Sequence, residues 1–328
     1  MLNPPDGFRE DDLARVLRES WGIVADRLEY RAVGFGSHHW EVGSGGTRWF
    51  VTVDEARSVD FEALAGALET AIRLRDNGFE FVIAPKPTLD GRSIAALGME
   101  FAVSLYSHID GEGFTFGEYR DGDHLNAVLD MLVALHTSPP ELWSAAPIDE
   151  FEIDRRKKLD RELENPCGTD EVTGPYTLRA VRLIAEHRDH IRRALDRYDG
   201  YTDLARSRPD RAVLTHGEPH AANTMRIRSG PMHTPAGFVL IDWESARIAP
   251  PERDLWDLSP ADGTAQREYT ARTGRTLIPD LLEMYRLRWD LTEVALYLHT
   301  FRNPHGDTEN DRVSWDGLVE SLEALSHR

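Results

Sequence analysis

The feature that most constrains the fold is a polar loop between two apolar strands in the C-terminal half of the chain. Residues 214–223 read Leu-Thr-His-Gly-Glu-Pro-His-Ala-Ala-Asn, and about twenty residues later the chain reads Val-Leu-Ile-Asp-Trp-Glu. The end of the first strand therefore presents an acid, Glu218, followed five residues on by the amide of Asn223. The second strand ends in the carboxylate of Asp242. An acid, an amide and a carboxylate in this order at two strand ends predict a catalytic site.

Protein kinases place a catalytic acid, a metal-binding Asn and a metal-binding Asp in the same order. Phosphoryl transfer needs positioned phosphates, Mg²⁺ to neutralise their charge, and an acid that orients the attacking hydroxyl. Since Mg²⁺ prefers hard oxygen ligands, Asn223 and Asp242 are the predicted metal ligands. Glu218 is the predicted catalytic acid. His220 either packs in the loop or contacts the transferred phosphate.

A zinc site is the competing interpretation of two histidines around Glu218. The zinc peptidase pattern needs His-Glu-x-x-His on a helix, whereas here Gly217 and Pro219 oppose a helix. Zinc deaminases need a cysteine pair, and Cys167 is the only cysteine in the chain. The sequence therefore disfavours zinc, and His216 is expected to brace the loop through a backbone hydrogen bond.

The N-terminal 110 residues predict a small antiparallel sheet with one helix. Aromatic and β-branched runs on either side of the Gly43-Ser-Gly-Gly turn predict a hairpin. Residues 9–20 and 61–74 are expected to be helical, with Asp60 as the cap of the second helix. Further strands are expected at 79–84 and 99–105. The loop Gly34-Phe-Gly-Ser-His-His lies between two strands, where its backbone N–H groups can approach phosphates. Strand alternation then predicts that one of His38 and His39 faces the cleft.

The remainder of the chain is mainly helical. A glycine-punctuated connector spans 111–122, and helices are expected at 124–136, 148–164, 175–197, 251–258, 278–302 and 313–326. The predicted fold class is α+β, with two domains. Residues 1–110 would form an N-terminal nucleotide-binding lobe, and residues 111–328 a larger helical lobe for catalysis and substrate binding. A cleft between two such lobes is a preferred ligand site.

These motifs together resemble the aminoglycoside phosphotransferase and choline-kinase-like superfamily. The family signature His-Gly-Asp-x-His-x-x-Asn is matched from His216 to Asn223, with Glu218 in place of Asp. Ile241-Asp-Trp-Glu is similar to the metal-binding segment of the family, and Glu252-Arg-Asp-Leu-Trp to the segment that follows it. Leu135-His-Thr-Ser-Pro-Pro also recurs there. Arg288-Trp-Asp-Leu and Phe301-Arg-Asn-Pro-His look similar to spectinomycin-phosphotransferase-like members.

The resemblance implies a protein-kinase-like two-lobe fold with ATP or GTP bound between the lobes, and with Asp254 bracing the catalytic loop. It places the adenine at a hinge near residues 106–109. The nucleotide-binding positions that it implies are Gly34, Gly36, Ser37, Thr52, Tyr106 and His108.

Two positions depart from the family pattern. Glu218 adds a methylene to the expected Asp. Thr52 stands where the third strand of the family carries a lysine that contacts the α- and β-phosphates. Because Lys86 is the only lysine before residue 157 and lies in a later loop, the phosphates must be held differently.

Composition limits the classes of partner. The net charge of −19 disfavours a nucleic-acid binder and is compatible with a cationic small substrate. Asp290 and Glu293 lie one helical turn apart, either on a solvated face or as a wall for such a substrate. With no apolar run that could span a membrane and no signal peptide, a cytoplasmic monomer or homodimer is expected.

Two hypotheses for the function follow. The first is an ATP-dependent kinase that phosphorylates a hydroxyl of an aminoglycoside-like or other cationic compound, with a role in antibiotic resistance. The second is a pseudokinase that binds a nucleotide or metabolite with little or no transfer. Thr52 and Glu218 motivate the second hypothesis, and the persistence of Asn223 and Asp242 favours the first.

Overall fold

The computed structural model describes residues 1, 3–5, 7–34, 36–56, 59–117, 119–164, 172–228, 237–258 and 262–327. Phe35 of the glycine loop and Cys167 lie outside this part of the chain. The chain forms two compact units. The first comprises Met1–Ile148 and Ala212–Thr276, and the second Asp149–Arg211 and Leu277–Arg328. The expected lobe boundary near residue 110 stays a prediction.

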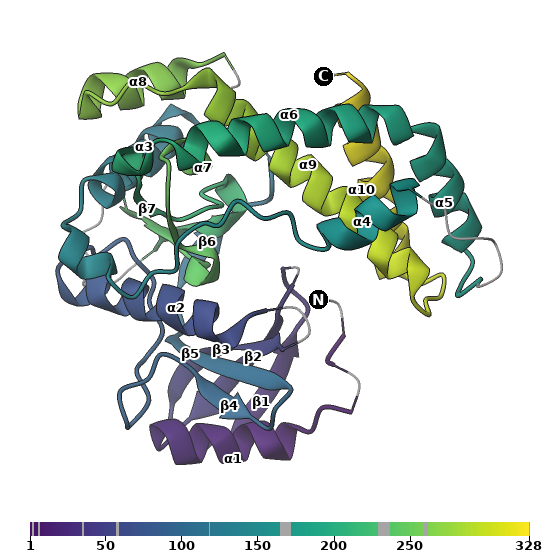
Figure 1. The fold of residues 1–328 in the computed structure, drawn as a ribbon. Coiled ribbons are helices and arrows are strands. Elements are labelled where there is room, and N and C mark those ends of the chain that lie inside the picture. The colour runs from purple at the N-terminus through teal and green to yellow at the C-terminus, as the bar shows by residue number, and fades with distance from the viewer. Residues whose placement is uncertain are drawn as a thin grey trace. The chain divides into compact units, whose positions relative to one another are not determined.

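The first unit contains a five-stranded sheet that confirms the expected antiparallel hairpin (Figure 1). The strand order is β1-β2-β3-β5-β4, with antiparallel neighbours throughout. The bounds are β1 Arg27–Arg31, β2 His38–Ser44, β3 Thr47–Glu55, β4 Ala95–Leu97 and β5 Phe101–Ser107. Helix α1 (Glu10–Trp21) lies along one face of the sheet and α2 (Phe61–Asp76) along the other (Figure 1). The carboxylate of Asp60 caps α2 by accepting from the N–H groups of Glu62 and Ala63, as expected.

The alternation of side chains gives the two faces of this sheet different characters. On one face, Trp40 and Val42 of β2 pack with Val51 and Val53 of β3 against Leu17 of α1, all almost fully buried. The opposite face carries the cross-strand pairs formed by the residues that alternate along each strand with those just named. They are His39 and Thr52, Thr52 and Ser104, and Phe50 and Tyr106. The polar face is therefore the one left for function.

The motif segments of the first unit form two small antiparallel sheets. β7 (Val213–Thr215) pairs with β10 (Arg247–Ala249), and β8 (Thr224–Ile227) lies between β6 (Gly111–Gly113) and β9 (Phe238–Leu240). The short helices beside them are η1 Pro140–Trp143, η3 Ala221–Asn223, η5 Trp243–Ser245 and α7 Glu252–Leu255. The longer helices are α3 Gly122–His136 and α8 Thr264–Thr273.

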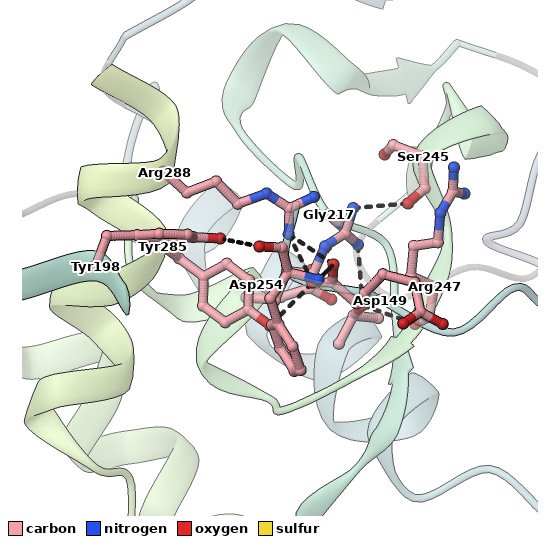
Figure 2. Close-up of polar contacts among 12 residues, drawn as sticks. Asp149, Tyr198, Gly217, Ser245, Arg247, Asp254, Tyr285 and Arg288 are labelled. Atoms are coloured by element: carbon pink, nitrogen blue, oxygen red, sulfur yellow. Dashed lines mark hydrogen bonds and ion pairs between the residues drawn. The ribbon is translucent and has the colours of Figure 1, made fainter. Parts of the chain in front are cut away.

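The second unit is helical in its described residues. Its elements are α4 Arg156–Glu164, α5 Thr177–Glu186, α6 Arg188–Arg206, η2 Pro209–Arg211, α9 Pro279–Arg302 and α10 Glu309–Ser326. Helix α9, whose buried residues include Leu291 and Leu298, packs against α6 and α10. Asp149 accepts hydrogen bonds from Arg288 at 2.7 and 2.8 Å and from the Tyr285 hydroxyl at 3.1 Å (Figure 2).

No helix in the described part of the chain is both long and apolar enough to cross a bilayer.

Three local expectations were wrong. Residues 79–84 form no strand, because the chain is still turning after α2 and Val82 makes only an isolated parallel bridge to Leu240. The helix expected at 148–164 begins only at Arg156, since Phe151 and Arg155 adopt positive φ angles. The helix expected at 175–197 is two helices that meet at His187.

Candidate functional site

Asp254 fixes the backbone at the start of the polar loop. Its carboxylate, almost fully buried on α7, accepts from the backbone N–H of His216 at 2.8 Å and of Gly217 at 2.6 Å. The His136 ring lies 3.0 Å from the same carboxylate. Figure 2 shows Asp254 facing Gly217. Although burial opposes ionisation, the hydrogen bond and charge of His136 lower the pKa of Asp254. Asp254 thus braces the loop in the manner that the family resemblance implied.

Arg253 ties the same loop to the short helix η5 that follows Asp242. Its guanidinium donates to the Thr215 hydroxyl at 3.0 Å and to the Ser245 carbonyl at 2.8 Å. The Ser245 hydroxyl donates to the His216 carbonyl at 2.7 Å. Gly217 has φ +107°, and a Cβ there would lie 2.5 Å from the guanidinium. This position therefore requires glycine.

His216 connects the loop to the segment that carries Asp242. Its Nε2 lies 2.9 Å from the Ile241 carbonyl, and its Nδ1 accepts from the Glu218 N–H at 3.3 Å. These partners assign the proton to Nε2 of a neutral ring. Burial lowers the pKa of His216 to about 4. The ring is fully buried with an edge toward Trp243, so His216 has the bracing role that was expected.

The neutral His216 predicts a component of acid lability. Because its pKa falls from 6.5 to about 4 on folding, the unfolded chain binds the proton first. The contribution of His216 is complete above about pH 6.5 and is lost as the pH falls toward 4, by about 3 kcal/mol in total. The difference in unfolding free energy between the wild type and His216→Asn, measured by urea unfolding, is expected to shrink across this range. A constant difference would contradict the prediction.

The predicted acid and the predicted metal ligands lie on neighbouring backbone. The side-chain amide of Asn223 donates to the Glu218 carbonyl at 2.9 Å. The Ile241 N–H donates to the Asn223 carbonyl at 2.9 Å, and β8 pairs Thr224 with Leu240. Asn223 and Asp242 are therefore held at the same end of the β8–β9 pair.

Glu218 is ionised at neutral pH and accessible. Its side chain is 43% exposed, and one carboxylate oxygen lies 3.7 Å from Nε2 of His220. Desolvation acts against ionisation, but the proximity of His220 lowers the pKa of Glu218 below its ordinary value. A carboxylate in this state can accept a hydrogen bond from a hydroxyl.

Asp242 has the properties expected of a cation ligand. Desolvation by the surrounding protein raises its pKa, a hydrogen bond with Glu244 opposes this rise, and the charge of Glu218 adds to it. It also holds a left-handed backbone conformation with φ 70°, which few residues other than glycine adopt. Hard oxygen donors with excess negative charge fit Mg²⁺. The residues present therefore suit the metal that the resemblance implies.

The polar face of the five-stranded sheet is electrostatically close to Asp242. Burial raises the pKa of Asp54 at the end of β3 to about 6; a hydrogen bond from Ser37 opposes this rise, and the charge of Asp242 adds to it. Burial and the charges of Glu244, Asp54 and Asp242 raise the pKa of Tyr106 on β5. The sheet face and the motif segments therefore influence each other electrostatically within the first unit.

The expected nucleotide-binding residues have different surroundings. Gly34 and Gly36 have φ +67° and +90°, as a tight loop requires. Ser37 is buried and donates to Asp54 at 2.5 Å, and Thr52 is buried beside His39. His108 contacts Arg48 at 3.4 Å. Their contacts with a nucleotide stay predictions.

The two expected substrate residues lie on α9 of the second unit. Asp290 is only 7% exposed, which excludes a solvated face for this side chain. Glu293 is partly exposed. Burial, followed by a hydrogen bond with Glu293, raises the pKa of Tyr297. The assignment of Asp290 and Glu293 to substrate binding stays a prediction.

Sequence reasoning missed the aromatic side chains of the connector at 111–122. The Tyr119 hydroxyl donates to the Pro219 carbonyl at 2.8 Å. Phe116 is 62% exposed, and its ring centroid lies 4.9 Å from that of His220 in an edge-on arrangement. The signal was the presence of aromatic residues in an otherwise glycine-rich stretch. The connector therefore adds side chains to the loop that carries Glu218.

Comparison with known proteins agrees with this geometry. A model of the phosphotransferase enzyme family matches residues 28–297. Protein StrN of Streptomyces griseus is 29% identical over 267 residues, which cover 78% of this chain and 76% of StrN. A spectinomycin phosphotransferase, solved with ADP and spectinomycin, superposes with a TM-score of 0.72 at 18% identity over 98% of both chains. A microcompartment-associated aminopropanol kinase superposes with a TM-score of 0.59 at 17% identity over 97% of both chains. The expected kinase-like fold is confirmed.

Proposed function

We propose that this chain, which belongs to the phosphotransferase enzyme family, transfers a phosphoryl group from ATP or GTP to a hydroxyl of a cationic, aminoglycoside-like small molecule. The observation that carries the proposal is the arrangement of one acid and two metal-ligand candidates on adjoining backbone. Glu218 and Asn223 are joined by a hydrogen bond of 2.9 Å, and Asn223 is joined in turn to the residue before Asp242.

Asn223 and Asp242 would hold Mg²⁺. Within the described residues, no group of three or more His, Cys, Asp or Glu side chains is arranged to bind a metal. Two protein ligands, with water and phosphate oxygens completing the shell, are what Mg²⁺ commonly accepts. When bound, Mg²⁺ neutralises charge on the phosphates.

Glu218 orients the acceptor. Its ionised carboxylate accepts a hydrogen bond from the substrate hydroxyl and takes up the proton as the oxygen attacks the terminal phosphorus. His220, 3.7 Å from this carboxylate, lowers its pKa further below neutral. The loop supports this geometry because Asp254, His216 and Asn223 each fix a backbone group on it.

The net charge of −19 and the character of the relatives support a cationic acceptor. Two of the structural neighbours are a spectinomycin phosphotransferase and an aminopropanol kinase, and the name of the second denotes an amine-bearing substrate. Phosphorylation of an aminoglycoside-like antibiotic by this chain would make it a resistance enzyme. The test is the turnover of Mg-ATP and Mg-GTP with a panel of hydroxylated amines. A wild-type protein that binds nucleotide and modifies none of them would support the pseudokinase instead.

Glu218→Asp is expected to lower kcat by roughly 10²-fold. Because Asp254, His216 and Asn223 hold the loop backbone in place, a side chain one methylene shorter withdraws its carboxylate by about 1 Å. A misplacement of this size can lower the rate by roughly 10²-fold. Initial rates at saturating nucleotide and acceptor measure the effect. Glu69→Asp, on the exposed side of α2, is the control and should leave kcat unchanged. A higher kcat for Glu218→Asp would mean that glutamate at this position lowers the rate of the wild-type protein.

A further inference from the structure

His39 lies directly opposite the residue that replaces the family lysine. Residues 39 and 52 are cross-strand partners on β2 and β3, so their side chains share one face of the sheet. Nδ1 of His39 is 3.3 Å from the Thr52 hydroxyl oxygen. This is the polar face of the sheet, which also carries Asp54 and Tyr106, the two residues influenced by the charge of Asp242.

The imidazole of His39 is fixed and aimed at the glycine loop. Its ring stacks on Phe50, with the centroids 5.2 Å apart and the planes at 26°. A Cβ placed on Gly34 would lie 3.5 Å from Nε2. The residue keeps partial exposure, whereas Thr52 is buried beneath it. Nε2 therefore lies beside Gly34 of the glycine loop.

The partners of His39 leave one donor available for an anion. A hydroxyl can donate to Nδ1 of a neutral imidazole, and the remaining proton then sits on Nε2. An Nε2–H group beside a glycine loop can donate to a phosphate oxygen, and hydrogen bonds to charged groups are among the stronger ones. Thr52 carries no positive charge that could bind a phosphate, but its hydroxyl positions the imidazole ring of His39, whose Nε2–H can donate.

We propose that His39 contacts the nucleotide phosphates through Nε2 and, positioned by Thr52, takes the place of the missing strand lysine. The proposal rests on the proposed function, since it assigns a residue to the nucleotide of that reaction. It also accounts for the threonine. A long cationic side chain at residue 52 would compete for the space that the ring of His39 occupies.

The test compares two ligands that differ in their phosphates. A non-hydrolysable ATP analogue with Mg²⁺ and adenosine alone are titrated into the full chain by calorimetry. His39→Phe keeps a ring that stacks on Phe50 and removes the donor. We expect it to weaken binding of the analogue by about 10- to 100-fold and to leave adenosine binding unchanged. His190→Phe, on α6 of the second unit, is the matched control and should bind both ligands like the wild type.

A second variant covers the case in which His39→Phe does not fold. His39→Asn is polar but too short to reach from Thr52 to Gly34, so the same selective loss is expected. In the double variant His39→Asn/Thr52→Lys, which frees the space of the ring, the new ammonium group should recover at least about tenfold of the affinity for the analogue.

Two results would overturn the inference. One is unchanged affinity for the analogue in a folded His39 variant, and the other is an equal loss for adenosine. Failure of the proposed function is visible elsewhere, because a wild-type protein that binds no analogue or transfers no phosphate defeats that function before any variant is compared.

Discussion

Asp242→Asn is expected to lower kcat by about 10²- to 10⁴-fold while the empty protein becomes no less stable. A metal-held carboxylate accounts for several kcal/mol of charge stabilisation in the transition state, and each 1.4 kcal/mol is about tenfold in rate. Asparagine has nearly the same shape and also tolerates the left-handed conformation with φ 70°. The fold should therefore survive while the metal affinity falls.

The predicted stability follows from the sign of the pKa shift. Burial and the Glu218 charge raise the pKa of Asp242 above its unfolded value, so its ionised form disfavours folding at neutral pH. A neutral amide removes this penalty and also relieves Glu244 and Asp54, whose pKa values burial and neighbouring carboxylates, Asp242 among them, raise. We expect the Tm of the metal-free protein to stay equal or to rise.

Three measurements separate these effects. Initial rates give kcat, titration of Mg²⁺ gives the concentration for half-maximal activity, and thermal unfolding in a chelator gives Tm. Asp76→Asn, an exposed carboxylate at the end of α2, should change none of the three. Full activity in Asp242→Asn would show that the proposed mechanism is wrong.

The sequence predicts the parts of this site that depend on local pattern. The hairpin of β2 and β3, the cap at Asp60 and the strand ends around Glu218 all follow from runs of a few residues, and the structure contains each of them. The bracing of the loop by Asp254 was implied by the family motif rather than by chemistry alone. Its two backbone hydrogen bonds now give that implication a physical basis.

What sequence reasoning could not supply depends on register and on backbone conformation. The pairing of His39 with Thr52 requires the exact alignment of two strands, which alternation alone leaves open by one residue. The late start of α4 follows from positive φ angles at Phe151 and Arg155, and neither residue type favours that conformation. The contact of Phe116 with His220 joins segments about 100 residues apart. Long-range packing therefore decides how the sheet face with His39 and the loop with Glu218 are built.

Asp254→Asn is expected to destabilise the first unit by about 3–5 kcal/mol, the range found when one partner of a buried ionic network is removed. The carboxylate uses both oxygens, one for the His216 N–H and the His136 ring and the other for the Gly217 N–H. An amide offers one oxygen, so at least one buried N–H faces a donor instead of an acceptor. Asp254, His216 and His136 are almost fully buried, so an unpaired donor among them is costly.

Urea unfolding and Tm measure this loss, and Asp196→Asn on the exposed side of α6 should stay within about 0.5 kcal/mol of the wild type. The variant also separates bracing from chemistry. If Asp254 acts through the loop, kcat measured well below the Tm should fall while the nucleotide KM changes little, because Glu218 moves but the sheet face with His39 does not. Wild-type stability would show that the two N–H groups find other acceptors, and Asp254 would then not be what holds Glu218 in place.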